Sequence, residues 1–202
     1  MAGFEVRNPT ITFRDRYALD LGDAHLRLTD WGPGIHHSAL FVHVVQDNLL
    51  VGMGMGGGRW IPGFADHDKP SLEDIRRAIS IYERLCDENF PIDVMIGIHK
   101  PYLNKSRQGF QQSGLYFQTL LDDLTQAQQD GLSLEQAKAE FSLNKQHAHF
   151  CSYFTLPEPE RREKQHQETM NTIWELLRKE GLTARVAGTS NKQVGPERQT
   201  AP

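Results

Sequence analysis

The chain has 202 residues, with 22 lysines and arginines against 26 aspartates and glutamates, and a formal net charge of −4. This length suits one domain with a full core better than two independent domains. The basic residues are spread along the chain, so neither a nucleic acid nor an acidic membrane is expected as a partner.

No window approaches the roughly 18 consecutive apolar residues that a membrane-spanning helix needs. The first residues contain no apolar signal core. The two cysteines, Cys86 and Cys151, lie far apart and belong to no paired-cysteine zinc motif. We therefore expect a cytoplasmic protein with two free thiols.

The segment from residue 9 to residue 51 is rich in β-branched and alternating runs. Turn residues separate these runs, and residues 46–48 form a tight turn into a further short strand. The pattern predicts an antiparallel meander. Its predicted strands are residues 10–13, 17–21, 24–28, 40–45 and 49–51.

A helix is predicted after the meander. Ser71 and Asp74 resemble a capping box, and apolar residues recur at helical spacing as far as Leu85. Pro91 follows the end of this helix, and residues 93–97 are predicted as a short buried strand. The helix therefore returns the chain to the sheet.

Helices are predicted for most of the second half. One covers residues 107–129, although Gly109 and Gly114 weaken its first turns, and Ser133 caps another. Residues 158–180 form a helix with three polar first turns, so we expect that half to project into solvent or onto a partner. The expected organisation is a domain over 1–156, a C-terminal helix over 157–186 and a disordered tail over 187–202.

Two short turns carry the strongest candidate chemistry. Residues 32–38 and 97–101 each place histidine and glycine beside a predicted strand. Glycine lets the backbone approach an ion closely, and a rigid strand fixes where an imidazole points. These turns are therefore candidates for metal binding or proton transfer.

The order of these features resembles the C-terminal half of the metallo-β-lactamase fold hydrolases, over about residues 9–141. In that family a histidine follows a Gly-Pro-like turn, an aspartate follows the hairpin glycine, and a last histidine follows a later strand. The similar positions here are His36 or His37, then Met53, then His99. The resemblance implies an α+β fold, half of an αββα sandwich with a helical C-terminal extension.

The sequence departs from the family pattern at the catalytic positions. The HxHxDH signature is absent, the bridging aspartate is replaced by the Gly-Met-Gly-Met run at residues 52–55, and the last turn is Gly-Ile-His-Lys. Thioethers are poor zinc ligands, and a catalytic zinc site needs three protein ligands. The loop with Asp66 and His67 is a candidate source of a third ligand. The candidate metal ligands are thus His36, His37, His99, His67 and Asp66.

Other histidines have alternative interpretations. His25 and His43 lie within strand patterns, where a hydrogen-bonded core or sheet-face histidine is favoured over a ligand. The His-x-His-x-Cys sequence at residues 147–151 would bind a soft metal if extended, but a surface loop or helix end is favoured.

The sequence favours a truncated metallo-β-lactamase-like protein with lost or weakened hydrolase activity and a ligand-binding or assembly role. Since half of a sandwich would expose an apolar face, we expect a homodimer or a partner that supplies the missing half. The alternative is a metal-dependent hydrolase of the ester, lactone or thioester class, with its site completed across a subunit interface. Its metal would be zinc, with iron or manganese as alternatives; the first hypothesis needs none, and no catalytic residue is assigned.

Overall fold

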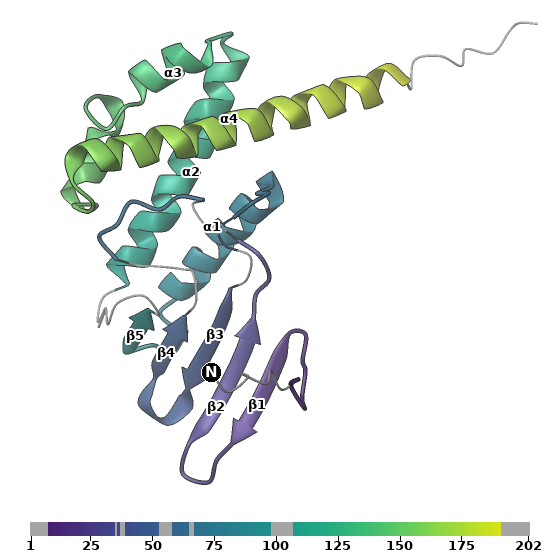
Figure 1. Ribbon diagram of the computed structural model, residues 1–202, viewed down its shortest axis with the longest axis vertical. Helices are drawn as coiled ribbons and strands as arrows, with labels where there is room; N and C mark the ends of the chain where they lie inside the picture. Colours follow the sequence, from purple (N-terminus) through teal and green to yellow (C-terminus); the bar gives the residue numbers. More distant parts are fainter. Residues whose placement is uncertain are drawn as a thin grey trace, which may run out of the picture.

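The computed structural model describes residues 8–34, 36, 39–52, 58–64, 67–97 and 107–190, with side chains as far as residue 181. It combines a five-stranded mixed sheet with a body of helices (Figure 1). The α+β class and the predicted meander are confirmed. The strands lie across the sheet in sequence order and are β1 (Arg16–Asp20), β2 (His25–Asp30), β3 (Leu40–Val44), β4 (Leu49–Gly52) and β5 (Val94–Gly97).

The first four strands are antiparallel, and β5 pairs parallel to β4. The tight turn predicted between β3 and β4 contains a short 3-10 helix, η1 (Val45–Asp47). Asn48 follows it in the left-handed region with φ of 46°, a conformation that asparagine tolerates better than most residues.

The prediction of a strand at residues 10–13 is wrong. These residues lie outside the sheet, and Phe13 instead stacks on Tyr17 with ring centroids 5.8 Å apart. β-branched side chains favour extended backbone, but a strand also needs a partner for its backbone groups.

Helix α1 (Leu72–Cys86) begins as predicted. The Ser71 hydroxyl accepts a hydrogen bond from the Asp74 N–H, and the Asp74 carboxylate accepts one from the Ser71 N–H. Eight of its residues are buried, and they recur at helical spacing along the stripe that the sequence indicated.

Helix α2 (Gln108–Gln129) packs along α1, and its early glycine has a packing role. A Cβ at Gly114 would lie 3.1 Å from the Cβ of Tyr82. The missing side chain therefore allows the two helices to approach closely, which outweighs the low helix propensity of glycine.

The remaining helices complete the body. They are α3 (Leu134–Glu140), the 3-10 helix η2 (Gln146–Ser152) and α4 (Pro159–Ser190), which extends past the expected end at residue 186. α4 lies across α2 (Figure 1). The core includes Tyr116, Phe117 and Phe150, all fully buried.

The polar first half of α4 does not project into solvent, so that expectation is wrong. His166 and Thr169 are buried, and Gln165 Nε2 donates to the Ile61 carbonyl oxygen (2.8 Å). The Arg162 guanidinium donates to the Phe154 carbonyl oxygen (2.8 Å). His166 and Thr169 are buried with hydrogen-bond partners. Arg162 and Gln165 are partly buried and bond to backbone carbonyls, which hydrophobic periodicity does not reveal.

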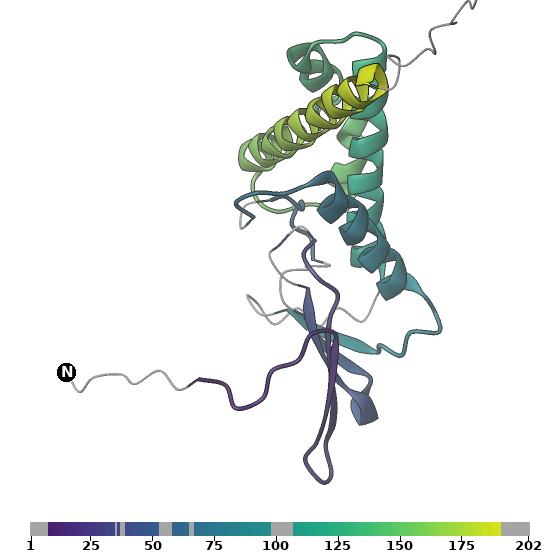
Figure 2. The same cartoon turned by 90° about the vertical axis from the view of Figure 1, so that its right-hand side faces the viewer.

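The two faces of the sheet differ. One face carries the buried residues Phe41, His43 and Leu50, and α1 with the segment leading to β5 lies on one side of the sheet in Figure 2. The opposite face carries two cross-strand rows of partly buried apolar side chains. We call these ten residues the apolar sheet face: Tyr17, Leu28, Val42, Val51, Ile96, Leu19, Leu26, Val44, Leu49 and Val94.

The apolar sheet face is separate from the core. In the described part of the chain, none of its ten residues belongs to the hydrophobic cluster that the helices form, or packs against that cluster. On this side the sheet thus presents an apolar surface of the kind that usually packs against a second layer.

Candidate functional site

The loops that carry the candidate ligands leave one end of the sheet. Phe41 of β3 pairs with Gly52 at the end of β4, and Gly52 pairs with Gly97 at the end of β5. Asp30, the last residue of β2, pairs with Leu40 at the start of β3. Three of the five candidates, His37, His99 and Asp66, lie outside the described residues.

The turn after β2 is held by backbone hydrogen bonds. The Ala39 N–H donates to the Gly32 carbonyl oxygen (2.9 Å), and the Gly34 N–H donates to the His36 carbonyl oxygen (3.0 Å). The Asp30 carboxylate accepts from the Gly32 N–H (2.9 Å). Gly32 has φ of 78°, which a residue with a side chain rarely adopts, so this glycine sets the turn that carries His36.

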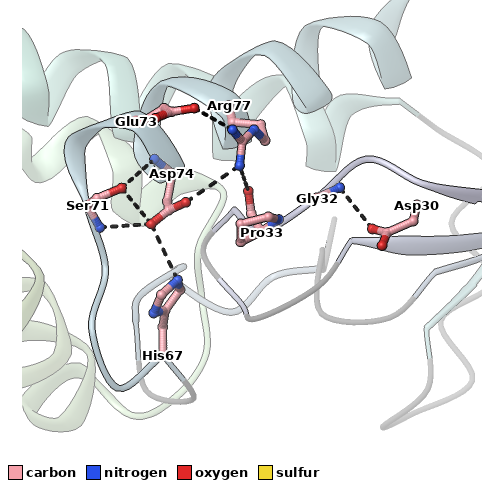
Figure 3. A network of polar contacts seen from close by, with 8 residues as sticks. All are labelled: Asp30, Gly32, Pro33, His67, Ser71, Glu73, Asp74 and Arg77. Atoms are coloured by element: carbon pink, nitrogen blue, oxygen red, sulfur yellow. Dashed lines mark hydrogen bonds and ion pairs between the residues drawn. The ribbon is translucent and has the colours of Figure 1, made fainter. Parts of the chain in front are cut away.

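His67 lies beside the first turn of α1 (Figure 3). Its Nε2 is 3.6 Å from Asp74 Oδ2, and both side chains are nearly buried, with 8% and 12% of the side-chain surface exposed. The same carboxylate oxygen accepts hydrogen bonds from the Ser71 N–H (2.9 Å) and hydroxyl (2.7 Å). Asp74 therefore caps the helix and places a carboxylate beside the His67 ring.

Arg77 extends this network to the turn after β2. Its guanidinium lies 3.7 Å from Asp74 Oδ1 and donates to the Pro33 carbonyl oxygen (3.2 Å) (Figure 3). It also pairs with Glu73. The start of α1 thus ties the His67 loop to the turn that carries His36, so these two candidates belong to one connected region.

This region does not form a metal site by itself. Within the described ranges, no three or more histidine, cysteine, aspartate or glutamate side chains are grouped to hold an ion. His67 and Asp74 contact each other, and Asp74 is engaged in the cap. A catalytic zinc ion needs three protein ligands, and His36 and His67 are the two candidates among the described residues, so the grouping of the five candidate ligands stays a prediction.

The His-x-His-x-Cys residues also form no shared site. His147 is fully buried, whereas His149 is exposed and contacts the Gln146 carbonyl oxygen through Nδ1 (3.1 Å). The Cys151 thiol contacts the Leu143 carbonyl oxygen at 3.7 Å. A 3-10 helix repeats every three residues, so η2 turns these three side chains in different directions.

His147 instead belongs to a buried chain of hydrogen bonds that joins η2, α2 and α4. His147 Nε2 lies 2.9 Å from Asp123 Oδ2, and His147 Nδ1 lies 3.3 Å from His166 Nε2. His166 Nε2 also lies 2.8 Å from the Phe141 carbonyl oxygen, and His166 Nδ1 lies 2.9 Å from the Tyr116 hydroxyl. We call these side chains the histidine chain.

The partners of the histidine chain fix where its protons lie. A carbonyl only accepts, so His166 Nε2 carries a proton and His166 Nδ1 accepts from Tyr116. His147 Nε2–H donates to Asp123. Burial lowers the pKa of His166 to about 4, against the hydrogen bond to Phe141. Burial also lowers the pKa of His147, against the opposing effect of Asp123. Both rings are therefore neutral at pH 7, as a structural network requires.

The strand histidines have separate environments. His25 is exposed, with Nδ1 3.4 Å from Asp20 Oδ2. His43 is a buried sheet-face histidine, only 8% exposed, as the strand pattern predicted; its ring bonds to the Pro91 carbonyl, and its Nε2 has no hydrogen-bond partner among the described residues. Burial and the nearby Arg27 lower the pKa of His43, against a smaller opposing effect of the Pro91 carbonyl.

Sequence reasoning missed Asp74 and Arg77 as organisers of the candidate region. The capping-box pattern predicted that Asp74 lies at the start of a helix. Its contact with His67 had no sequence signal beyond the presence of a histidine nearby in the chain. Arg77 had no sequence signal, because its target is a backbone carbonyl of a distant turn.

The fold class follows from this arrangement and from comparison with solved structures. The chain has part of the metallo-β-lactamase fold, in agreement with the sequence resemblance. No family model matches the sequence, and a search of curated proteins finds no match.

A metallo-β-lactamase family protein from Thermus thermophilus is similar over 87% of this chain and 50% of its own, with a TM-score of 0.55 and 19% identity. The stereoselective inverting sec-alkylsulfatase Pisa1 from Pseudomonas sp. is similar over 83% of this chain and 26% of its own, with a TM-score of 0.55 and 13% identity. A double mutant of that sulfatase is similar over 95% of this chain and 29% of its own, with a TM-score of 0.53 and 13% identity. The chain thus spans half or less of these proteins.

The described helices include none that is long and apolar enough to cross a bilayer.

Proposed function

We propose that this chain is a half-fold relative of the metallo-β-lactamase-like hydrolases that has lost or weakened the hydrolytic activity and acts in assembly. The apolar sheet face is the assembly surface. A second copy of the chain covers it, and the two sheets pack face to face in a homodimer.

The observation that carries this proposal is the continuity of the apolar sheet face. Its two registered rows cross all five strands without a charged residue, for example from Leu28 through Val42 to Val51. Stacked sheets pack about 10 Å apart, and burying apolar surface stabilises an assembly by roughly 25 cal/mol per Å². An apolar face of this extent favours a covered state over exposure to water.

A second copy suits this face because both surfaces would be apolar and of equal size. Two-fold pairing brings the same patch of each subunit together, so the absence of charge among the ten residues avoids repulsion between like groups. The second option is a different chain that supplies the other half of the sandwich, which would present an apolar sheet of its own.

The test places a charge at the centre of the apolar sheet face. Val42 lies on the central strand between Leu28 and Val51, so Val42→Lys would bury a lysine at the interface. We expect the unchanged protein to be a dimer and Val42→Lys to be a monomer of 23.0 kDa in sedimentation equilibrium. Leu115→Lys is the control, because Leu115 is an exposed apolar residue on α2 and its change should leave the dimer intact.

A monomeric unchanged protein that stays folded at tens of micromolar would contradict the homodimer. A dimer that survives Val42→Lys would place the interface elsewhere and would equally reject the apolar sheet face as the assembly surface.

The second candidate function is a metal-dependent hydrolase whose site is completed across the subunit interface. One observation favours it: the Asp74 carboxylate lies 3.6 Å from Nε2 of His67, and histidines that bind metals commonly have a carboxylate beside the other ring nitrogen. Metal analysis of protein purified without a histidine tag separates the two candidates. About one zinc per chain that is lost in His67→Ala but kept in His149→Ala, with ester or lactone turnover, would favour the hydrolase.

A further inference from the structure

A cavity of about 480 Å³ opens on the sheet face opposite to the apolar sheet face. Its floor includes the buried side chains Phe41, His43 and Leu50, and Trp31 and Phe90 also line it. Pockets of 300–1,000 Å³ with mainly apolar walls and a few polar groups are the usual form of small-molecule sites.

Three arginines line this cavity. Arg16 and Arg27 lie on neighbouring strands, since Arg16 pairs with Thr29 and Arg27 pairs with Ala18, so they are diagonal neighbours on one face. The third, Arg84, comes from α1. None of the described residues that line the cavity is an aspartate or glutamate. Among the described residues, none of the three guanidinium groups forms an ion pair with a carboxylate.

Aromatic rings hold Arg84 in place at the cavity. Its guanidinium carbon lies 4.6 Å from the centroid of the Trp31 ring and 5.9 Å from that of Phe90. Such stacking orients a guanidinium without neutralising it. The result is a concentration of positive charge above an apolar floor, which a bound anion would relieve.

Two buried polar atoms lie in residues that line the same cavity. His43 is only 8% exposed, and its Nε2 has no hydrogen-bond partner among the described residues. The ring already donates its N–H to the Pro91 carbonyl, so Nε2 is an acceptor that a donor such as a hydroxyl, rather than an anion, would satisfy. The Trp31 indole Nε1–H is likewise buried and without a partner among the described residues. An indole N–H only donates, and an unmade buried hydrogen bond is costly, so an acceptor at this site would be stabilising.

We propose that this cavity binds a small organic anion, with an aromatic or aliphatic body against Phe41 and Phe90 and a carboxylate, sulfonate or phosphate group among Arg16, Arg27 and Arg84. The inference is independent of the proposed assembly, because the three arginines and the buried floor residues Phe41, His43 and Leu50 belong to the sheet face opposite to the apolar sheet face or to α1. Of the apolar sheet face, Tyr17 and Leu28 also line the cavity. The shared chemistry is a planar or tetrahedral anion joined to an apolar group, which guanidinium groups recognise through paired hydrogen bonds.

The test is titration calorimetry at pH 7 with naphthalene-2-sulfonate as the anionic probe and 2-naphthol as its neutral counterpart. Parallel titrations with 2-naphthoate and 2-naphthyl phosphate identify the preferred anionic group. We expect saturable binding of one anionic probe per chain and at least tenfold weaker binding of 2-naphthol. Arg27→Gln and Arg84→Gln should each weaken anion binding about tenfold, the loss expected for one charge-assisted hydrogen bond.

Arg161→Gln is the matched control, because Arg161 is an exposed arginine at the start of α4 and its loss changes the net charge equally. It should bind the probe as the unchanged protein does. In NMR spectra, the probe should shift the side-chain resonances of His43 and Trp31. Thermal unfolding of each variant checks that it is folded.

Three results would overturn the proposal. They are no saturable binding up to millimolar probe, equal affinity for 2-naphthol, and anion binding that survives both cavity substitutions. If Val42→Lys abolished probe binding while the arginine variants kept it, the probe would lie on the apolar sheet face and the cavity would not be its site.

Discussion

The histidine chain of the helical body and the apolar sheet face differ in how many contacts their side chains make within the described chain. In the body, the histidine chain gives each buried ring nitrogen of His147 and His166 a partner, and α4 adds further side-chain bonds to backbone carbonyls. In the described sheet, the apolar sheet face packs against no part of the core, and His43 retains an unpartnered buried nitrogen. The comparison shows that the apolar sheet face, unlike the histidine chain, lacks packing partners among the described residues, and this is the contrast that the proposed dimer would explain.

The largest expected effect comes from breaking the histidine chain. His166→Leu would leave the Tyr116 hydroxyl, the Phe141 carbonyl and His147 Nδ1 without their buried partner. We expect the free energy of unfolding to fall by about 3 kcal/mol, measured by urea denaturation, because each unmet buried group costs about 1–3 kcal/mol. His149→Leu is the matched control, since His149 is exposed, and its effect should be within about 0.5 kcal/mol. Equal effects of the two variants would show that the histidine chain is not a stabilising network.

Acid should destabilise the body next most strongly. The folded protein lowers the pKa of His166 from 6.5 to about 4, so its stabilisation is complete above pH 6.5 and is lost as the pH falls toward 4. Between pH 7 and pH 5 we expect a loss of about 2 kcal/mol in the free energy of unfolding, to which the lowered pKa of His147 adds in the same direction. The slope should be much smaller in His166→Leu. An unchanged slope in that variant would assign the acid sensitivity to other groups.

The smallest of these effects is expected at the two capping boxes, one at the start of α1 and one at the start of α3. Ser71→Ala should cost about 1 kcal/mol, because it removes the cap of α1 and one of the bonds to Asp74 that hold the His67 loop. Ser133→Ala removes the same type of cap from the short helix α3, where the Ser133–Gln136 hydrogen bonds are solvent-exposed, and should cost less. Thermal unfolding of both variants tests the order, and a larger loss at Ser133 would argue against the network in Figure 3.

Much of the fold was predictable because local signals and tertiary structure agree. Alternating apolar residues gave β1 to β4, and the Ser71 and Ser133 caps placed the starts of α1 and α3. The strand predicted at residues 10–13 was wrong because propensity does not supply a pairing partner. The burial of His166 was missed because polar residues carry no hydrophobic periodicity, and their partners come from distant parts of the chain.

The candidate site was only partly predictable. The sequence singled out the turn with His36 and the loop with His67, and the network through Asp74 and Arg77 connects these two segments. His37, His99 and Asp66 lie outside the described residues, so their grouping stays a prediction. The arginine-lined cavity had no motif, since its charges come from β1, β2 and α1 and meet only through strand register and helix packing.

The mass of the protein in solution tests the central claim most directly. Sedimentation equilibrium at micromolar concentration should give twice the chain mass of 23.0 kDa for the unchanged protein, and the single chain mass for Val42→Lys. A folded single chain in both samples would contradict the account, because the apolar sheet face would then be stable in water without a second copy.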